Sequence, residues 1–221
     1  MTLYLISTPI GNLEDISFRA LRILKQVDLI LAEDTRRTGI LLNKYDIKNR
    51  QESFNDNNKE KKTRFVIELL KQGKDIALVS DSGTPGISDP GFYLTRECVK
   101  NNIVVSPIPG PNAAISALIS SGFATDRFTF IGFLPKKEKA RSDILNKIKD
   151  LNSTFIIYES PYRIQKTLKA MSEIIPDRKI CIAREMTKKF EEFIRGNSTE
   201  LYNNLKNRNI KGEITIVVDK I

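Results

Sequence analysis

Short apolar runs alternate with amphipathic stretches through the first half of this 221-residue chain. Runs of about four to eight residues rich in Val, Ile and Leu are typical of buried strands, and longer stretches with apolar residues at every third or fourth position are typical of helices. Strands that alternate with helices indicate βαβ units and a mostly parallel sheet. The expected strands are 3–7, 27–32, 75–80 and 103–106, and the expected helices are 17–26, 63–72, 92–101 and 112–120.

The pattern changes after residue 120, where Ser120, Ser121 and Gly122 are followed by Thr125 and Asp126 and indicate a linker. We therefore expect an N-terminal α/β domain over 1–120 and a C-terminal α/β domain over 121–221. The polar stretch 49–62 is expected to be a mobile loop that continues into a frayed helix start. In the second half we expect strands at 128–132, 154–158, 179–184, 190–195 and 213–218, and helices at 141–149, from Pro161 onward and at 199–205.

Glycine and proline gather where the expected strands end, which is where α/β proteins bind ligands. The loop 81–91 contains three glycines and two prolines, so its backbone can approach a ligand closely and present N–H groups to it. Asp81 could accept a hydrogen bond from a ribose hydroxyl or an amine; the alternative is a tight turn capped by aspartates. No loop matches the dinucleotide fingerprint or the Walker P-loop. The residues alone therefore indicate a ligand-binding α/β protein without identifying its ligand. The other strand-end loops are 8–12, 33–37 and 107–114.

The net charge of +9 is concentrated in the second half of the chain. Residues 1–116 hold 16 basic and 14 acidic side chains, and residues 117–221 hold 20 and 13. A basic surface favours a polyanionic partner, although solubility or a general lysine bias would explain it equally well. The basic run Lys136, Lys137, Lys139 and Arg141 either binds phosphate or is the solvated start of a helix.

The chain has no histidine, so acid–base chemistry must come from Asp, Glu, Lys, Tyr, backbone groups or the substrate. Cys98 and Cys181 are too few, and lie in stretches too apolar or helical, for a disulfide framework or a metal site. No apolar run reaches the roughly 18 residues that a membrane helix needs, and the N-terminus lacks the basic start of a secretory signal. We expect a cytoplasmic protein without a metal or a membrane partner.

Together these clusters resemble the tetrapyrrole-methylase superfamily of S-adenosylmethionine enzymes. They are most similar to its ribosomal RNA branch, the small-subunit (16S) rRNA cytidine-2′-O-methyltransferases. The match runs in order through almost the whole chain and is most specific in the glycine-proline loop combined with YESP. The matching segments are TPIGNLEDIS, AEDTR, SDSGTPGISDPG, PIPGPNAA, GFLP, YESPYR, AREMTKKFEEFIRG and KGEITIVV.

This resemblance implies an α/β fold of two domains, with a mostly parallel sheet in the first and a mixed sheet in the second. It also implies S-adenosyl-L-methionine as methyl donor in the cleft between the domains, a homodimer, and 16S rRNA of the small ribosomal subunit as substrate. The loop around Pro9 and Gly11 would close the cleft. The implied donor-binding residues are Asp81, Gly83, Thr84, Pro85, Ile87, Asn112, Ala113, Ala114, Tyr158, Glu159, Met186, Gly212, Glu213 and Ile214.

The chain departs from the family pattern at several positions. Family histidines are replaced by Arg37, Asn55 or Asn57, Tyr162 and Phe190, so histidine is not the base in this chain. Asn112 stands where serine is usual and can keep a side-chain hydrogen bond. Larger relatives carry a further C-terminal segment, which this chain lacks, and RNA binding is expected to be affected more than methyl transfer.

A ribose hydroxyl is a poor nucleophile at neutral pH, so a carboxylate should assist methyl transfer. The candidates are Asp34, Glu33 and Glu185. The alternatives are that Glu33 and Asp34 cap the following helix and that Glu185 forms an interdomain salt bridge with Arg184. The expected RNA-binding residues are Arg36, Arg37, Lys136, Lys137, Arg163 and Lys188. Two other functions stay open: methylation of a tetrapyrrole or another small molecule, and non-catalytic ribosome binding.

Overall fold

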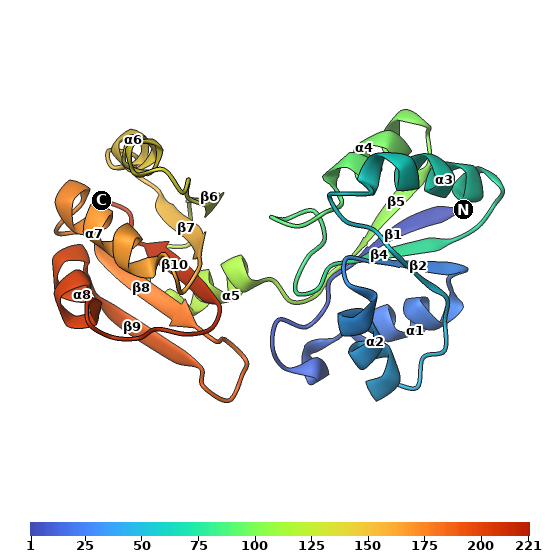
Figure 1. Ribbon diagram of the computed structural model, residues 1–221, viewed down its shortest axis with the longest axis horizontal. Coiled ribbons are helices and arrows are strands. Elements are labelled where there is room, and N and C mark those ends of the chain that lie inside the picture. The colour runs from blue at the N-terminus through green and yellow to red at the C-terminus, as the bar shows by residue number, and fades with distance from the viewer. The chain divides into compact units, whose positions relative to one another are not determined.

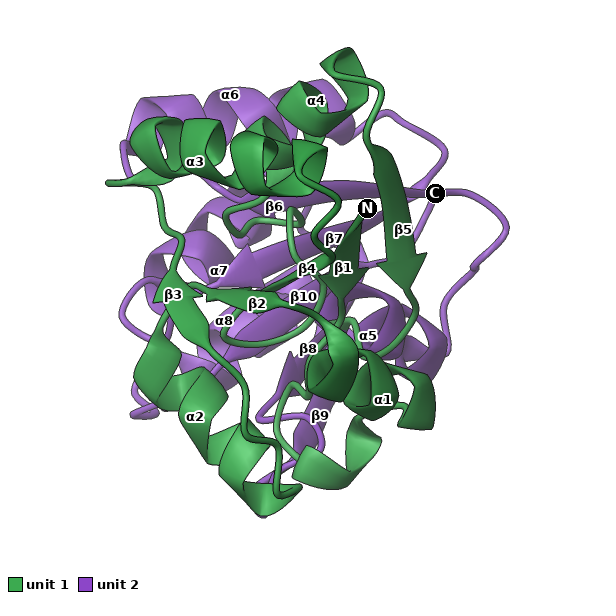
Figure 2. Cartoon of the chain, turned by 90° about the vertical axis from the view of Figure 1, so that its right-hand side faces the viewer, with its two compact units in different colours: residues 1–112 green, residues 113–221 purple.

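The computed structural model describes residues 1–221, which form two compact units, Met1–Asn112 and Ala113–Ile221 (Figure 2). The boundary lies before the position expected from the linker at residue 120. Helix α5 (Ala113–Ser121) packs on strands of the second unit, where its Ala117 and Leu118 are buried. The small side chains of α5 allow it to pack closely on this sheet. The serine-glycine stretch that suggested a linker after residue 119 gives no indication of this packing.

The first unit is a five-stranded sheet in the order β3-β2-β4-β1-β5, with every neighbouring pair parallel. This confirms the parallel sheet predicted from the alternating pattern. The strands are β1 (Thr2–Ile6), β2 (Leu29–Ala32), β3 (Gln51–Ser53), β4 (Ile76–Val79) and β5 (Val104–Ile108).

Helices cover both faces of this sheet (Figure 1). The short 3₁₀ turn η1 (Leu13–Asp15), α1 (Phe18–Gln26) and α2 (Thr35–Lys44) lie on one side, and α3 (Lys59–Lys71) and α4 (Phe92–Lys100) lie on the other. The chain moves outward from β1 to β3 and then back through β4 to β5, so right-handed crossovers place the two helix pairs on opposite faces.

Each central strand contributes side chains to two hydrophobic cores because successive side chains point to opposite faces of the sheet. In β2, Ile30 and Ala32 join the core formed with α1 and α2, whereas Leu29 and Leu31 join the core formed with α3 and α4. Both faces are buried, which explains why β2 and β4 are continuous apolar runs.

The stretch 49–62 holds the expected start of a helix, but it also holds a strand where its polarity suggested a mobile loop. Gln51–Ser53 form the edge strand β3, which pairs in parallel with β2, and α3 begins at Lys59. These strand residues are polar and partly exposed at the sheet edge. Backbone pairing with β2 therefore determines the strand, and hydrophobic periodicity carries no signal for it.

The second unit has a mixed sheet in the order β6-β7-β10-β8-β9, in which only β6 and β7 are parallel. The last strand of the chain, β10, lies in the centre with all five residues buried. The mixed sheet confirms the second part of the predicted fold class. The strands are β6 (Phe128–Phe133), β7 (Thr154–Glu159), β8 (Lys179–Arg184), β9 (Glu192–Asn197) and β10 (Ile214–Val218).

Three helices, α6 (Glu138–Ile148), α7 (Ile164–Ile174) and α8 (Ser198–Leu205), build the hydrophobic core of the second unit with one face of its sheet. Helix α5 packs on β7, β8 and β10. No helix in either unit combines the length and the apolar composition needed to cross a bilayer.

Replacing Leu78 by Ala should lower the free energy of unfolding by about 2–5 kcal/mol, because the change leaves a cavity in a packed core. Leu78 lies in the central strand β4 and is 1% exposed. The matched control is Ile40→Ala on α2, where the side chain is 63% exposed and the change should stay within about 0.5 kcal/mol. Denaturant unfolding of both variants measures the difference, and equal effects would contradict the packing described for β4.

Candidate functional site

Four loops begin at one edge of the first unit because its parallel strands end level with one another. Ile6 of β1 is in register with Val79 of β4 and Ile108 of β5, and Ala32 of β2 is also in register with Val79. The loops that follow these residues carry all the first-unit residues expected to bind the donor. The edge is therefore where the fold gathers the glycine-proline loops.

Hydrogen bonds join three of these loops into one assembly. Thr8 and Gly83 exchange backbone hydrogen bonds of 2.9 and 3.0 Å. The Thr84 hydroxyl donates to the Pro111 carbonyl at 3.2 Å and accepts from Asn112 Nδ2 at 3.2 Å. It also lies 3.1 Å from the Ser7 hydroxyl. Asn112 thus keeps the side-chain hydrogen bond expected of it in place of serine.

Two glycines are required by this arrangement. Gly83 has φ +81°, which side chains on an L-residue rarely tolerate. At Gly110 a Cβ atom would lie 3.0 Å from Ser7 Cβ and 3.3 Å from the Ser7 carbonyl oxygen. The loops after β1, β4 and β5 can therefore pack together only with glycine at these positions.

Carboxylates link the loop after β2 to the loop after β4. Asp81 accepts the Asp34 N–H at 2.9 Å, and the Asp81 N–H donates to Glu33 Oε2 at 3.4 Å. Burial raises the pKa of Glu33, and the nearby negative charge of Asp81 raises it further. The hydrogen bond from the Asp81 N–H lowers this pKa but does not offset the other two effects. Arg37 Nε lies 3.5 Å from Asp81 Oδ2.

Asp34 has a different environment from Glu33. It caps α2 by accepting the Arg36 N–H at 2.9 Å, and its two oxygens lie 3.0 and 2.6 Å from the Arg36 guanidinium. The side-chain hydrogen bond from Arg36, followed by the backbone bond, holds the pKa of Asp34 well below its usual range. The helix-cap alternative therefore applies to Asp34, and Glu33 is the more basic carboxylate of the pair.

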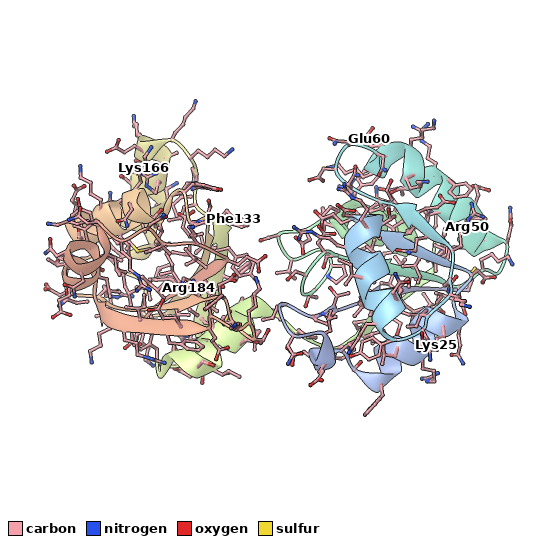
Figure 3. All side chains as sticks on the ribbon, turned by 60° about the horizontal axis from the view of Figure 1, so that its bottom comes forward. Lys25, Arg50, Glu60, Phe133, Lys166 and Arg184 are labelled. Atoms are coloured by element: carbon pink, nitrogen blue, oxygen red, sulfur yellow. The ribbon has the colours of Figure 1, made fainter.

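The second unit has a corresponding edge. Ile214, at the start of β10, is in register with Glu159 at the end of β7 and with Arg184 at the end of β8. Figure 3 shows Phe133 and Arg184 on this side of the unit, where β6 and β8 end. The register places the segments Tyr158–Glu159, Glu185–Met186 and 212–214 beside one another.

Two of these residues are held by contacts inside the second unit. Glu159 is 3% exposed and accepts hydrogen bonds from the Ser160 N–H and the Thr167 hydroxyl, with Arg163 Nε 3.5 Å away. The Tyr158 hydroxyl accepts the Ala114 N–H at 3.2 Å, which joins the start of α5 to this edge. Glu159 therefore organises the loop after β7, and Tyr158 is positioned by α5.

Glu185 braces the turn that leads into β10. It has φ +52° and accepts hydrogen bonds from the Glu213 N–H and from Lys188 Nζ, each at 2.9 Å. Burial alone would raise the pKa of Glu185, but these two hydrogen bonds outweigh it and lower the pKa. A Cβ atom at Gly212, which has φ +92°, would lie 2.4 Å from the Glu185 side chain. The salt bridge to Arg184, the alternative role considered for Glu185, does not form; Arg184 pairs with Glu192 at 3.0 Å.

Strained backbone also marks the predicted loops. Five non-glycine residues have positive φ. Asp46 and Asn102 directly follow the ends of α2 and α4, a common place for this conformation. The other three, Ser88, Glu185 and Thr187, fall in the loops that the sequence singled out, as is typical of functional sites.

The basic residues expected to bind RNA differ in their freedom to do so. Lys136 and Lys137 are exposed just before α6, and Arg37 is 62% exposed. Arg36 is 88% exposed but bound to Asp34. Arg163 donates to the Leu134 and Pro135 carbonyls, and Lys188 pairs with Glu185 and Glu213, so both stabilise the second unit.

Several residues that build these edges were not expected from the sequence. Ser7, Thr8 and Thr167 are buried polar residues whose hydroxyls join separate segments. Ser7 and Thr8 stand directly before a proline-glycine loop, which could have indicated them, whereas Thr167 lies inside an ordinary helical pattern. No group of three or more Cys, Asp and Glu side chains in residues 1–221 is arranged to hold a metal ion.

Comparisons with known proteins agree with this arrangement. The profile of the Tetrapyrrole (Corrin/Porphyrin) Methylases matches residues 2–202. A Thermotoga maritima protein named ribosomal RNA small subunit methyltransferase I is 50% identical over 98% of this chain and 97% of its own length. A Halalkalibacterium halodurans protein with the same name is 49% identical over 99% of this chain and 75% of its own length.

Solved structures share the fold at low sequence identity. Diphthine synthase matches 99% of this chain and 90% of its own with a TM-score of 0.75 and 11% identity. Cobalt precorrin-4 methyltransferase matches 99% of this chain and 94% of its own with a TM-score of 0.70 and 16% identity. These likenesses confirm the predicted α/β fold class.

Replacing Gly212 by Ala should destabilise the protein more than replacing Gly73 by Ala. The two glycines have φ +92° and +89°, but a Cβ atom at Gly73 meets nothing within 4 Å. The control should lose about 1–2 kcal/mol from the left-handed backbone alone, and Gly212→Ala should lose a further 1–3 kcal/mol, roughly, from overpacking against Glu185. Adding Glu185→Ala should recover part of that excess. Unfolding free energies test this, and equal losses at the two glycines would contradict it.

Proposed function

The chain belongs to the tetrapyrrole methylase family, and from this premise we propose that it methylates a cytidine ribose 2′-hydroxyl in 16S rRNA with S-adenosyl-L-methionine as donor. The observation that carries the proposal is the identity of 49–50% to proteins named ribosomal RNA small subunit methyltransferase I, over nearly the whole chain. The proposed substrate is the RNA of the small ribosomal subunit, the proposed compartment is the cytoplasm, and the proposed working unit is a homodimer.

The first-unit edge fits the chemistry of this donor. S-adenosyl-L-methionine carries a sulfonium and an ammonium group, and the half-buried Glu33 and Asp81 supply negative charge near each other. Their mutual repulsion contributes to the raised pKa of Glu33, so a cation is favoured there. Asp81 is proposed to accept hydrogen bonds from the ribose hydroxyls of the donor. The pocket around the donor is proposed to be formed by Gly83, Thr84, Pro85, Ile87 and Asn112.

The second unit is proposed to contribute the remaining donor contacts from its own edge. Met186 is 8% exposed and follows the braced Glu185. The backbone of 212–214 is held at the start of β10 by the Glu185 carboxylate. We assign donor contacts to Ala113, Ala114, Tyr158, Met186 and residues 212–214, and a supporting role to Glu159.

When bound, the donor supplies an electrophilic methyl group activated by the sulfonium. Glu33 is the proposed general base: burial and Asp81 raise its pKa, so its carboxylate accepts a proton more readily than Asp34. Glu33 would take up the proton of the ribose 2′-hydroxyl as the methyl group is transferred to the ribose oxygen. Asp34 orients Arg36. Glu185 positions the turn before β10.

RNA binding is proposed to rest on Arg36, Arg37, Lys136 and Lys137, which are exposed. Phosphate contacts from such residues fix the register of RNA without reading its sequence. Selection of one cytidine would then depend on the shape of the folded RNA or on an unstacked base.

The function is tested by transfer of radiolabelled methyl from S-adenosyl-L-methionine to small ribosomal subunits from a strain that lacks this protein. One labelled ribose is expected, and Asp81→Ala should abolish the label. Asp177→Ala, an exposed aspartate between α7 and β8, is the matched control and should methylate normally. Labelling of a tetrapyrrole but not of subunits would move the function elsewhere in the family, and donor binding without any transfer would refute the proposal.

Glu33→Gln should lower kcat by roughly 10²–10⁴-fold at neutral pH, the usual contribution of a general base. Because the base must be deprotonated and its pKa is raised, wild-type kcat/KM should increase as pH rises through that pKa. The variant should lose this acidic limb while retaining donor affinity. Glu68→Gln, at an exposed position of α3, serves as control. An unchanged pH profile for Glu33→Gln would remove Glu33 from the role of base.

A further inference from the structure

Arg141 is a buried cation without an anionic partner. It is 4% exposed, yet no Asp or Glu side chain forms an ion pair with it. Its Nη1 makes one long hydrogen bond, 3.5 Å to the Lys136 carbonyl, and its buried Nε has no partner at all. Glu138, one turn earlier on the same helix, is exposed and does not pair with it. Buried charges in proteins are normally paired, so this guanidinium calls for an explanation.

The guanidinium lies at the N-terminal end of α6. Arg141 shares the core-facing side of this helix with Leu145 and Ile148, and helical side chains point back toward the N-terminus. The bond to the Lys136 carbonyl places the head group beside the first turn. Lys137 caps the helix without a side-chain hydrogen bond, so the first N–H groups have no such acceptor. The positive end of the helix dipole and a buried guanidinium therefore meet at one point.

Arg163 contacts the same segment as Arg141, but its guanidinium has several hydrogen-bond partners and a carboxylate nearby. It donates to the carbonyls of Leu134 and Pro135, the two residues before Lys136, and its Nε lies 3.5 Å from Glu159. Two arginines thus contact one short segment, 134–136, and Glu159 pairs with Arg163. The positive charge of Arg141 remains uncompensated within the second unit.

We propose that Arg141, the first turn of α6 and Lys137 form a binding site for one phosphate group of the RNA substrate. This inference rests on the proposed RNA function and adds a residue and a geometry to it. A phosphate offers several acceptor oxygens, which suit both the guanidinium fork and free N–H groups at a helix N-terminus. The segment 134–136 joins this site through Arg163 to Glu159, at the edge where donor contacts are proposed. A phosphate bound there would anchor the strand that carries the target ribose.

The test compares Arg141→Met with Lys147→Met. Met matches the apolar stem of arginine but lacks the guanidinium. Lys147 is an exposed cation on the same helix, so both variants lose one positive charge. For Arg141→Met we expect affinity for small ribosomal subunits to fall on the order of ten-fold and the slope of log affinity against log salt to decrease by about 1. Donor affinity measured by calorimetry should not change. Lys147→Met should resemble wild type in every measurement.

Stability separates this site from a purely structural role. Without RNA, Arg141→Met should keep or raise the melting temperature, because it replaces an unpaired buried charge by an apolar side chain. A lower melting temperature together with wild-type RNA affinity and salt slope would overturn the proposal. Inorganic phosphate should raise the melting temperature of wild type but not of Arg141→Met. If phosphate raises the melting temperature of wild type but Arg141→Met binds RNA with wild-type affinity, the site binds a free anion and the RNA assignment is wrong.

The same experiment distinguishes this inference from the proposed function. If wild-type protein neither binds nor methylates small subunits, the proposed function fails. If wild type methylates them and Arg141→Met binds them with the same affinity and salt slope, only the phosphate site is refuted.

Discussion

Pairing of β4 between β1 and β2 is the constraint on which the first unit depends. The register of these strands brings their carboxyl ends level, so that the loops after them begin at the same edge. Gly83 then reaches Thr8 through two backbone hydrogen bonds, and Thr84 reaches the loop after β5. A shift of one residue in β4 would turn its buried side chains to the opposite face and move the glycine-proline loop away from its partners.

Three neighbouring carboxylates show how the environment divides roles among similar groups. Asp34 is held by Arg36 and caps a helix, which favours its charged form. Glu33 is partly buried near Asp81 and has a raised pKa. Asp81 joins the two loops by accepting the Asp34 N–H. A chain without histidine therefore has one carboxylate whose proton affinity is adjusted by burial and by a like charge.

Charged residues in the second unit serve the fold as much as any ligand. Glu159 holds two segments together, and Glu185 fixes the turn before the central strand. The partners of Arg163 and Lys188 lie inside the unit, which limits their freedom to contact RNA. Against this background Arg141 is distinctive because it is buried and lacks any acidic partner.

The sequence by itself determined the parallel sheet of the first unit and the loops in which unusual residues gather. These two features follow from local rules: apolar periodicity, and the need for glycine and proline where the backbone turns sharply. The mixed sheet of the second unit was expected from the family resemblance. The sequence also led to the family, because the glycine-proline loop and the YESP segment are specific in combination.

Only the tertiary structure decided the edge strand β3, the placement of α5 in the second unit and the individual roles of the charged residues. Backbone pairing with β2 forms β3. Packing on β7, β8 and β10, which follow much later in the sequence, places α5 in the second unit. Whether a carboxylate caps a helix, braces a turn or has a raised pKa depends on neighbours far away in sequence, such as Asp81 for Glu33. Burial and electrostatic interaction act through space, so a linear pattern can name the candidates but cannot assign their roles.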